Sequence, residues 1–145
     1  MPVWLTAKCP LRSFAATRYC AQQTSFWGVT LVNADLIKRL IVAFNAHDAA
    51  AFAGAFTDDG VMYAYPDQVA GRGRVEIKDY IGKMFAAFPQ VKVDLLGRID
   101  LGMRQITHEQ FDRGDGSTTY AAGLVYTLSE AGISRLDFVR ELRRG

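Results

Sequence analysis

The sequence predicts an α+β domain in which three helices pack on a mostly antiparallel sheet. Apolar residues recur every three or four positions in residues 33–45 and 74–88, as they do in amphipathic helices. From residue 91 onward the apolar period changes to two, which is typical of strands that bury one face. Helices followed by a run of strands favour an α+β architecture.

Composition and charge narrow the classes of function. The chain has 145 residues, of which 50% are hydrophobic and 22% charged, so it is expected to form one globular domain. It contains no apolar run of membrane-spanning length and no basic stripe, so neither a membrane nor a nucleic acid is the expected partner. Its two histidines do not stand at metal-ligand spacing, and it lacks a dinucleotide fingerprint, so no metal or cofactor is expected.

The first 32 residues are predicted to be separate from the domain at 33–145. Residues 1–34 carry Lys8, Arg12 and Arg18 but no acidic residue. Three interpretations are open: translated sequence upstream of the true start, an ordered arm, and, ranked after these two, an organelle transit peptide. The domain has no cysteine, which fits a reducing compartment, and a cytoplasmic location is expected.

Capping residues and breakers set the bounds of the helices. Asn33 is expected to cap the first helix, Asp48 a short second one, and Pro89 ends a third that begins near Arg74. The predicted buried stripes of the first and third helices contain Ile37, Leu40, Ile41 and Phe44, and Ile77, Ile81, Met84, Phe85 and Phe88.

Turn signals separate the strands. A turn at 57–60 is expected to precede a short strand at 61–65, which Pro66 stops, and 71–73 forms a further break. The longer strands are predicted near 91–95, 104–112, 118–128 and 133–142. Glycine-containing turns join the last three of them at 113–116 and 129–132.

Several motifs occur in the order seen in one superfamily. They are Phe44-Asn45-Ala46-His47-Asp48, Phe56-Thr57-Asp58-Asp59-Gly60, the proline at 66, Gly71-Arg72-Gly73, and the segment 125–133 around the last turn. Over residues 33–142 the chain resembles the nuclear transport factor 2-like superfamily, in particular its SnoaL-like and ketosteroid-isomerase-like bacterial members. The resemblance implies a cone-shaped fold whose curved sheet wraps the helices and leaves a pocket.

The catalytic positions of two enzyme groups in that superfamily are not preserved here. The positions of the ketosteroid isomerases fall at Leu40, at Ala64 or Tyr65, and near Leu124, and none carries the needed group. Of the Asp-Arg-Asp set of the limonene-epoxide hydrolases, Asp112 alone is matched clearly. Neither activity is therefore predicted in its known form.

The candidate catalytic pair lies on the strand 104–112. His108, Gln110 and Asp112 alternate there, so they are expected to share one face. We take His108 and Asp112 as the predicted acid–base pair. In the competing interpretations His108 is an ordinary strand residue and Asp112 caps the following turn. The predicted substrate-binding residues are Leu40, Phe44, Tyr63, Tyr65, Phe85, Gln110, Leu124, Tyr126, Leu136 and Phe138.

The opposite face of the strands is predicted to be the convex face of the sheet. Glu109 is assigned to it, together with Ala121, Gly123 and Val125. Small side chains allow a second sheet to approach closely, and members of the superfamily often dimerise in this way. A homodimer through this convex face is therefore expected.

The predicted function is the binding of a small, largely apolar metabolite. The chain is either a cofactor-independent acid–base enzyme of the isomerase, hydrolase or dehydratase kind, or a non-catalytic module that binds a ligand or a partner. The resemblance indicates the fold but leaves these two classes open.

Overall fold

The computed structural model describes residues 36–140, and the following account concerns that part of the chain. Asn33 and the first 32 residues lie outside it, so their predicted roles stay predictions. The first helix is described from residue 36 to residue 45. The later elements are α2 (Ala49–Gly54), β1 (Phe56–Ala64), β2 (Gln68–Arg72), α3 (Gly73–Ala87), β3 (Lys92–Asp100), β4 (Arg104–Asp112), β5 (Tyr120–Ser129) and β6 (Gly132–Arg140).

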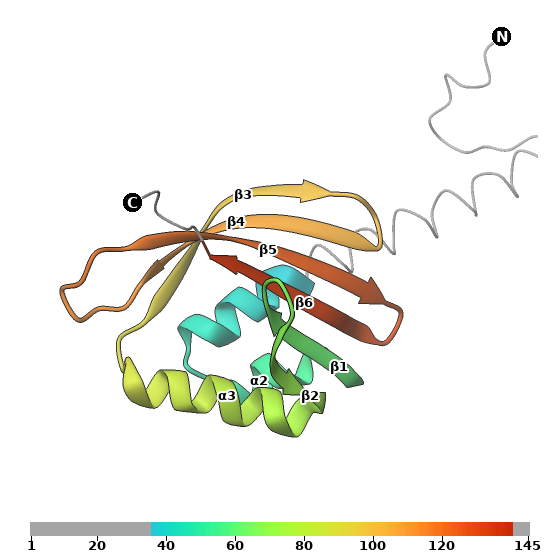
Figure 1. Ribbon diagram of the computed structural model, residues 1–145, viewed down its shortest axis with the longest axis horizontal. Coiled ribbons are helices and arrows are strands. Elements are labelled where there is room, and N and C mark those ends of the chain that lie inside the picture. Colours follow the sequence, from blue (N-terminus) through green and yellow to red (C-terminus); the bar gives the residue numbers. More distant parts are fainter. Residues whose placement is uncertain (1–35, 141–145) are drawn as a thin grey trace, which may run out of the picture. The chain divides into compact units, whose positions relative to one another are not determined.

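Six strands form one sheet in the order β2-β1-β6-β5-β4-β3. Only β1 and β6 run parallel, and the other neighbours are antiparallel. The sheet curves, and the helices lie on its concave side (Figure 1). The predicted α+β architecture is confirmed. No helix among the described residues is long and apolar enough to cross a membrane.

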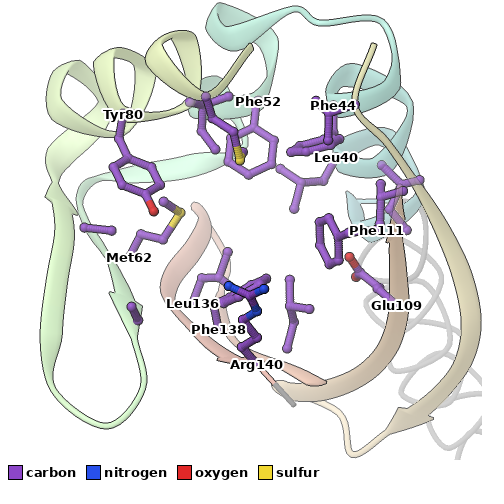
Figure 2. Close-up of a pocket in the computed structure, with 18 of the residues that line it drawn as sticks. Leu40, Phe44, Phe52, Met62, Tyr80, Glu109, Phe111, Leu136, Phe138 and Arg140 are labelled. Carbon is purple, nitrogen blue, oxygen red and sulfur yellow. The ribbon is translucent and has the colours of Figure 1, made fainter. Parts of the chain in front are cut away.

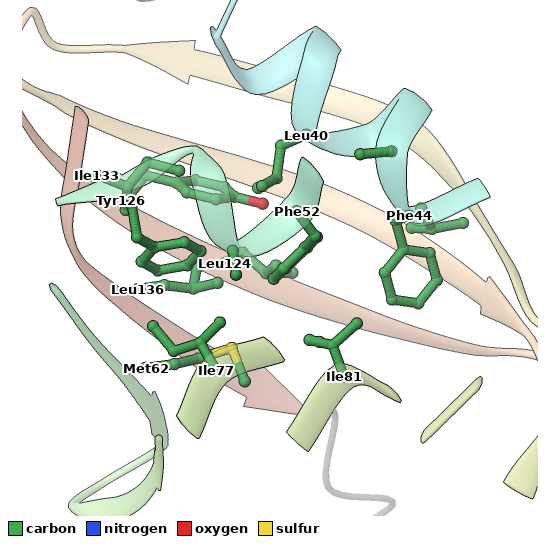
Figure 3. Packing of buried hydrophobic residues seen from close by; sticks show 14 of the residues in the cluster. Leu40, Phe44, Phe52, Met62, Ile77, Ile81, Leu124, Tyr126, Ile133 and Leu136 are labelled. Carbon is green, nitrogen blue, oxygen red and sulfur yellow. The ribbon is translucent and has the colours of Figure 1, made fainter. Parts of the chain in front are cut away.

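The helices pack on the sheet through the predicted stripes. Ile37, Leu40 and Phe44 of the first helix are buried, as are Ile77, Ile81 and Phe85 of α3. Asp48 caps α2, because its carboxylate accepts a hydrogen bond from the amide of Ala51 at 2.9 Å. Figure 3 shows side chains of these helices meeting Leu124, Tyr126 and Leu136 of the sheet. One continuous core results.

The end of the first helix is tied to the start of β3 by side chains. Asn45 donates a hydrogen bond to the carbonyl of Val93 at 2.9 Å and accepts one from its amide at 2.8 Å. His47 bonds the Val91 carbonyl through Nε2 at 2.8 Å, and its ring stacks on Phe85 with centroids 4.6 Å apart. These contacts give the Asn-Ala-His segment a structural role.

The prediction of a turn at 57–60 is wrong. These residues belong to β1, which starts at Phe56 and pairs irregularly with β6 before resuming regular pairing at Val61. Gly60 permits this close approach, since a Cβ there would lie 2.9 Å from the Ile133 carbonyl oxygen. Arg74 donates to the Phe56 carbonyl at 2.9 Å and helps hold this edge. The predicted break at 71–73 is partly strand, because β2 runs to Arg72.

Gln105 on the inner face of β4 yields a stability prediction. Its side chain is 0% exposed, and neither its Nε2 nor its Oε1 has a hydrogen-bond partner. We expect Gln105→Leu to raise the free energy of unfolding by about 1–3 kcal/mol, because an unsatisfied buried amide is removed. Urea denaturation checks this, with Gln110→Leu on the outer face as a matched control of small effect. A lower stability of Gln105→Leu would contradict it.

The expected dimer leads to a second prediction. Gly123 lies on the outer face of β5, where a Cβ would meet nothing closer than 4.0 Å. We expect Gly123→Arg to convert a convex-face dimer into a folded monomer, because a long charged side chain blocks sheet-to-sheet approach. Light scattering after size exclusion measures the mass. A cooperative unfolding transition shows that the monomer is folded, with a midpoint lowered by the stability that association gave the dimer. An unchanged dimer mass would place the dimer contact elsewhere.

Candidate functional site

A cavity of about 480 Å³ lies between the helices and the concave face of the sheet. Figure 2 looks into it, with Phe44 and Phe52 on the helical side and Leu136 and Phe138 on the sheet side. Most of its wall is apolar or aromatic. The polar and charged side chains that line it are Tyr63, Tyr80, Lys83, Glu109, Arg113, Tyr120, Tyr126 and Arg140. A cavity of this size and character suits a small, mainly apolar molecule.

Glu109 is the acidic side chain in this lining. It belongs to β4, is only 2% exposed, and points its carboxyl group into the cavity beside Phe111 (Figure 2). Its cross-strand neighbour on β5 is Ala122, whose small side chain crowds the carboxyl group little. A carboxyl group in such apolar surroundings is unusual, because burial disfavours its charged form.

Two hydroxyl groups bind the same oxygen of Glu109. Thr107 donates to Oε1 at 2.7 Å and Tyr126 at 3.1 Å. Burial raises the pKa of Glu109 above its ordinary value, and the two hydrogen bonds oppose that rise in part. Burial, together with the neighbouring Glu109, holds the pKa of Tyr126 well above its ordinary value, so Tyr126 stays a donor. Among residues 36–140, no group donates a hydrogen bond to the other oxygen, Oε2.

His108 and Asp112 do not line the cavity, so the predicted placement of the catalytic pair is wrong. Both are exposed on the outer face of β4. The Asp112 carboxylate accepts a hydrogen bond from the Gly114 amide at 2.8 Å, which is the turn-capping alternative. The cause is strand parity: the inward residues of β4 are the odd-numbered ones, so Glu109 is inside and not on the convex face as predicted.

The predicted binding residues divide in two. The cavity wall includes Leu40, Phe44, Tyr63, Leu124, Tyr126, Leu136 and Phe138. Tyr65, Phe85 and Gln110 do not line this cavity. Tyr65 is 64% exposed beyond the end of β1, Phe85 is buried under His47, and Gln110 shares the outer face of β4 and bonds Thr119 at 3.2 Å.

The sequence interpretation missed Glu109, Arg113 and Arg140 as cavity residues. One available signal pointed to Glu109. Phe111 alternates with it, and a large aromatic side chain marks the face of a strand that packs on the core. Phe111 is 5% exposed and contacts the rings of Phe44 and Phe138.

Comparison with protein families agrees with this fold. The family model described as the SnoaL-like domain matches residues 37–136. The chain belongs to the SnoaL-like domain family. The resemblance drawn from the motifs is thereby confirmed. Comparison with curated proteins gives no match.

Solved structures share the architecture of this SnoaL-like domain. A cystatin-fold protein of Novosphingobium aromaticivorans is 26% identical with a TM-score of 0.69, over 74% of this chain and 97% of that one. A putative SnoaL-like polyketide cyclase of Jannaschia sp. CCS1 is 12% identical with a TM-score of 0.65, over 75% and 85%. TerC, co-crystallised with polyporic acid, is 13% identical with a TM-score of 0.65, over 75% and 91%. The last two likenesses show the fold alone.

Within residues 36–140 of the SnoaL-like domain, no three histidine, cysteine or acidic side chains gather closely enough to hold a metal ion. The polar groups that line the described cavity are the Glu109 carboxyl group, hydroxyl donors and cationic side chains. This combination supports proton transfer to or from a bound molecule.

The pKa of Glu109 makes stability depend on pH. The folded domain holds this proton more tightly than the unfolded chain, whose value is near 4.5. The free energy of unfolding therefore falls as pH rises from 4.5 through the folded-state pKa. We expect Glu109→Gln to abolish this fall, so that the variant gains on the wild type toward alkaline pH. Urea denaturation across pH measures it, with exposed Glu130→Gln as control. Parallel wild-type and Glu109→Gln curves would contradict it.

Proposed function

We propose that this SnoaL-like domain binds a small, largely apolar metabolite in its cavity and catalyses a cofactor-independent proton transfer on it, with Glu109 as the general base. The observation that carries the proposal is a buried carboxyl group lining an apolar cavity, with both hydroxyl donors bound to a single oxygen. The reaction class is isomerisation, dehydration or cyclisation through loss of an acidic C–H proton.

The environment of Glu109 suits this role. Burial raises the pKa of the Glu109 carboxyl group, so its carboxylate takes up a proton more readily than an exposed one does. The hydrogen bonds from Thr107 and Tyr126 hold Oε1 in place. They thereby restrict rotation of the carboxyl group and fix the direction of Oε2. We therefore assign Thr107 and Tyr126 as positioning residues.

A further hydroxyl group of the cavity supplies a donor for the developing negative charge. Tyr80 on α3 lines the cavity, and Figure 2 shows its hydroxyl directed inward. Tyr63 also borders the cavity, but its ring lies under the guanidinium group of the exposed Arg135 at 4.1 Å, so we assign it no such role. Loss of a proton next to a carbonyl group places charge on the carbonyl oxygen, where a hydrogen-bond donor stabilises it. A putative polyketide cyclase and a protein crystallised with polyporic acid share this fold, which favours a small unsaturated molecule with carbonyl groups as the substrate class.

Deuterium exchange of a neutral aromatic ketone tests the base. β-Tetralone in D2O is the substrate. The Glu109 carboxylate removes the acidic C–H proton, and the electron pair moves to the carbonyl oxygen as an enolate. The proton on Glu109 exchanges with D2O, and Glu109 then returns a deuteron to carbon as the enolate collapses to the ketone. We expect Glu109→Gln to slow the enzyme-dependent exchange, measured by proton NMR, about a hundredfold or more. The control Glu130→Gln removes a carboxylate from the exposed surface and should leave the exchange rate unchanged.

Two further measurements make the exchange experiment decisive. Displacement of the neutral fluorophore N-phenylnaphthylamine by β-tetralone shows that the ketone occupies the cavity. Tyr126→Phe removes a hydrogen bond that lowers the pKa of Glu109, so the acid limb of the pH–rate profile should move to higher pH. Exchange equal in wild type and Glu109→Gln, with the cavity occupied, would assign the protein to the non-catalytic binding modules.

A further inference from the structure

We propose that the cavity selects molecules with one anionic group, which Arg113 and Arg140 bind at its mouth while the apolar body lies inside. This inference rests on the proposed function and names its substrate class: aromatic or otherwise unsaturated apolar acids. The reacting carbon would then lie near Glu109, and the acid group would remain outside the reaction.

Cationic side chains gather where the cavity meets solvent. Lys83, Arg113 and Arg140 line it, and all three are exposed or half-buried, whereas Glu109 is buried. Among residues 36–140, neither Arg113 nor Arg140 forms an ion pair with a carboxylate. Figure 2 shows the guanidinium group of Arg140 directed toward the cavity. Arg113 lies close enough to Asp115 to help lower the pKa of that exposed carboxyl group, but it forms no ion pair with it. Cations that line an apolar cavity and form no ion pair match an anionic ligand group.

Aromatic rings hold the two guanidinium groups in place. Arg140 lies over the ring of Tyr120 at 4.5 Å, and Arg113 lies over the rings of Phe88 and Tyr120 at 4.8 and 5.5 Å. Such contacts reduce the conformational freedom that an exposed arginine would otherwise lose on binding. Preorganised guanidinium groups recognise a carboxylate or sulfonate better than mobile ones.

The same rings continue from the mouth into the cavity. Tyr120 stacks on Phe111 at 5.4 Å with an interplanar angle of 11°, and Phe111 meets Phe138 edge to face at 5.5 Å. Phe111 also adjoins Glu109 in Figure 2. A path of aromatic surface therefore leads from the guanidinium groups toward the carboxyl group. This arrangement favours a flat, unsaturated body that carries its acid group at one end.

Two fluorophores that share an aromatic body test this selection. Anilinonaphthalene sulfonate carries one negative charge, and N-phenylnaphthylamine carries none. We expect the wild-type chain to bind the sulfonate more tightly, with an affinity that falls as salt is added. The double variant Arg113→Gln, Arg140→Gln should bind the sulfonate about tenfold more weakly and the neutral probe unchanged. Naphthoate and methyl naphthoate, used as competitors, repeat the comparison with a carboxylate.

Two control variants separate charge from structure. Arg104→Gln removes the same charge from an exposed position of β4 outside the cavity and should change neither affinity. Arg113→Lys, Arg140→Lys keeps the charge and should retain most of the preference for the sulfonate. Thermal unfolding of each variant shows that the fold is kept.

The outcomes distinguish this inference from the proposed function. Tight binding of the neutral probe with no preference for the sulfonate, or equal loss of both probes in the double Gln variant, would overturn the anion-binding mouth and leave the Glu109 proposal standing. The anion-binding mouth would also be overturned if Arg104→Gln lost as much sulfonate affinity as the double variant. The loss would then reflect the net charge of the protein and not these two positions. If neither probe binds the wild type, the cavity does not take ligands and both proposals fail.

Discussion

The structure depends on how the first helix is held across the concave face of the sheet. Asn45 pairs with both backbone groups of Val93, and His47 reaches the Val91 carbonyl while stacking on Phe85. These contacts join the helix end to the start of β3 and to α3. Because both Leu40 and Phe44 of that helix line the cavity, the cavity wall is fixed by polar bonds at its edge as well as by apolar packing.

That arrangement gives Glu109 its unusual surroundings. The helices cover the concave face, so an inward side chain of β4 is removed from water whatever its chemistry. The inward side chain of Phe111 packs in the core. Glu109 and Gln105 also point inward, but they place polar groups there, and the Gln105 amide has no hydrogen-bond partner. Burial of a carboxyl group costs free energy that an apolar residue would not. Retention of stability-lowering groups is typical of sites with a chemical task, which is why Glu109 carries our proposal.

The sequence predicted the fold better than the site, and the reason is physical. Helical stripes, the Asp48 cap and the change of period at residue 91 are local signals, and each specified its element. Alternation with period two does not show which face of a strand points inward, because the residues of both faces recur at the same spacing. On β4 polar residues occupy both faces, so pairing His108 with Asp112 by spacing chose the outer one. Only Phe111 among the inward residues signalled the true parity.

The sequence did not predict that Arg113 and Arg140 lie together at the mouth of the cavity, for a different reason. Arg113 follows β4 and Arg140 ends β6, so they are 27 positions apart and separated in the sheet by β5. No spacing rule brings them together; the sheet order and Tyr120 at the start of β5 do, because both guanidinium groups lie over that one ring. In the sequence Arg113 belongs to a predicted turn and Arg140 to the predicted last strand. In the fold they form the charged rim of an otherwise apolar cavity, opposite in character to the carboxyl group inside it. A ligand with an acid at one end and an acidic C–H group further along its body satisfies both at once.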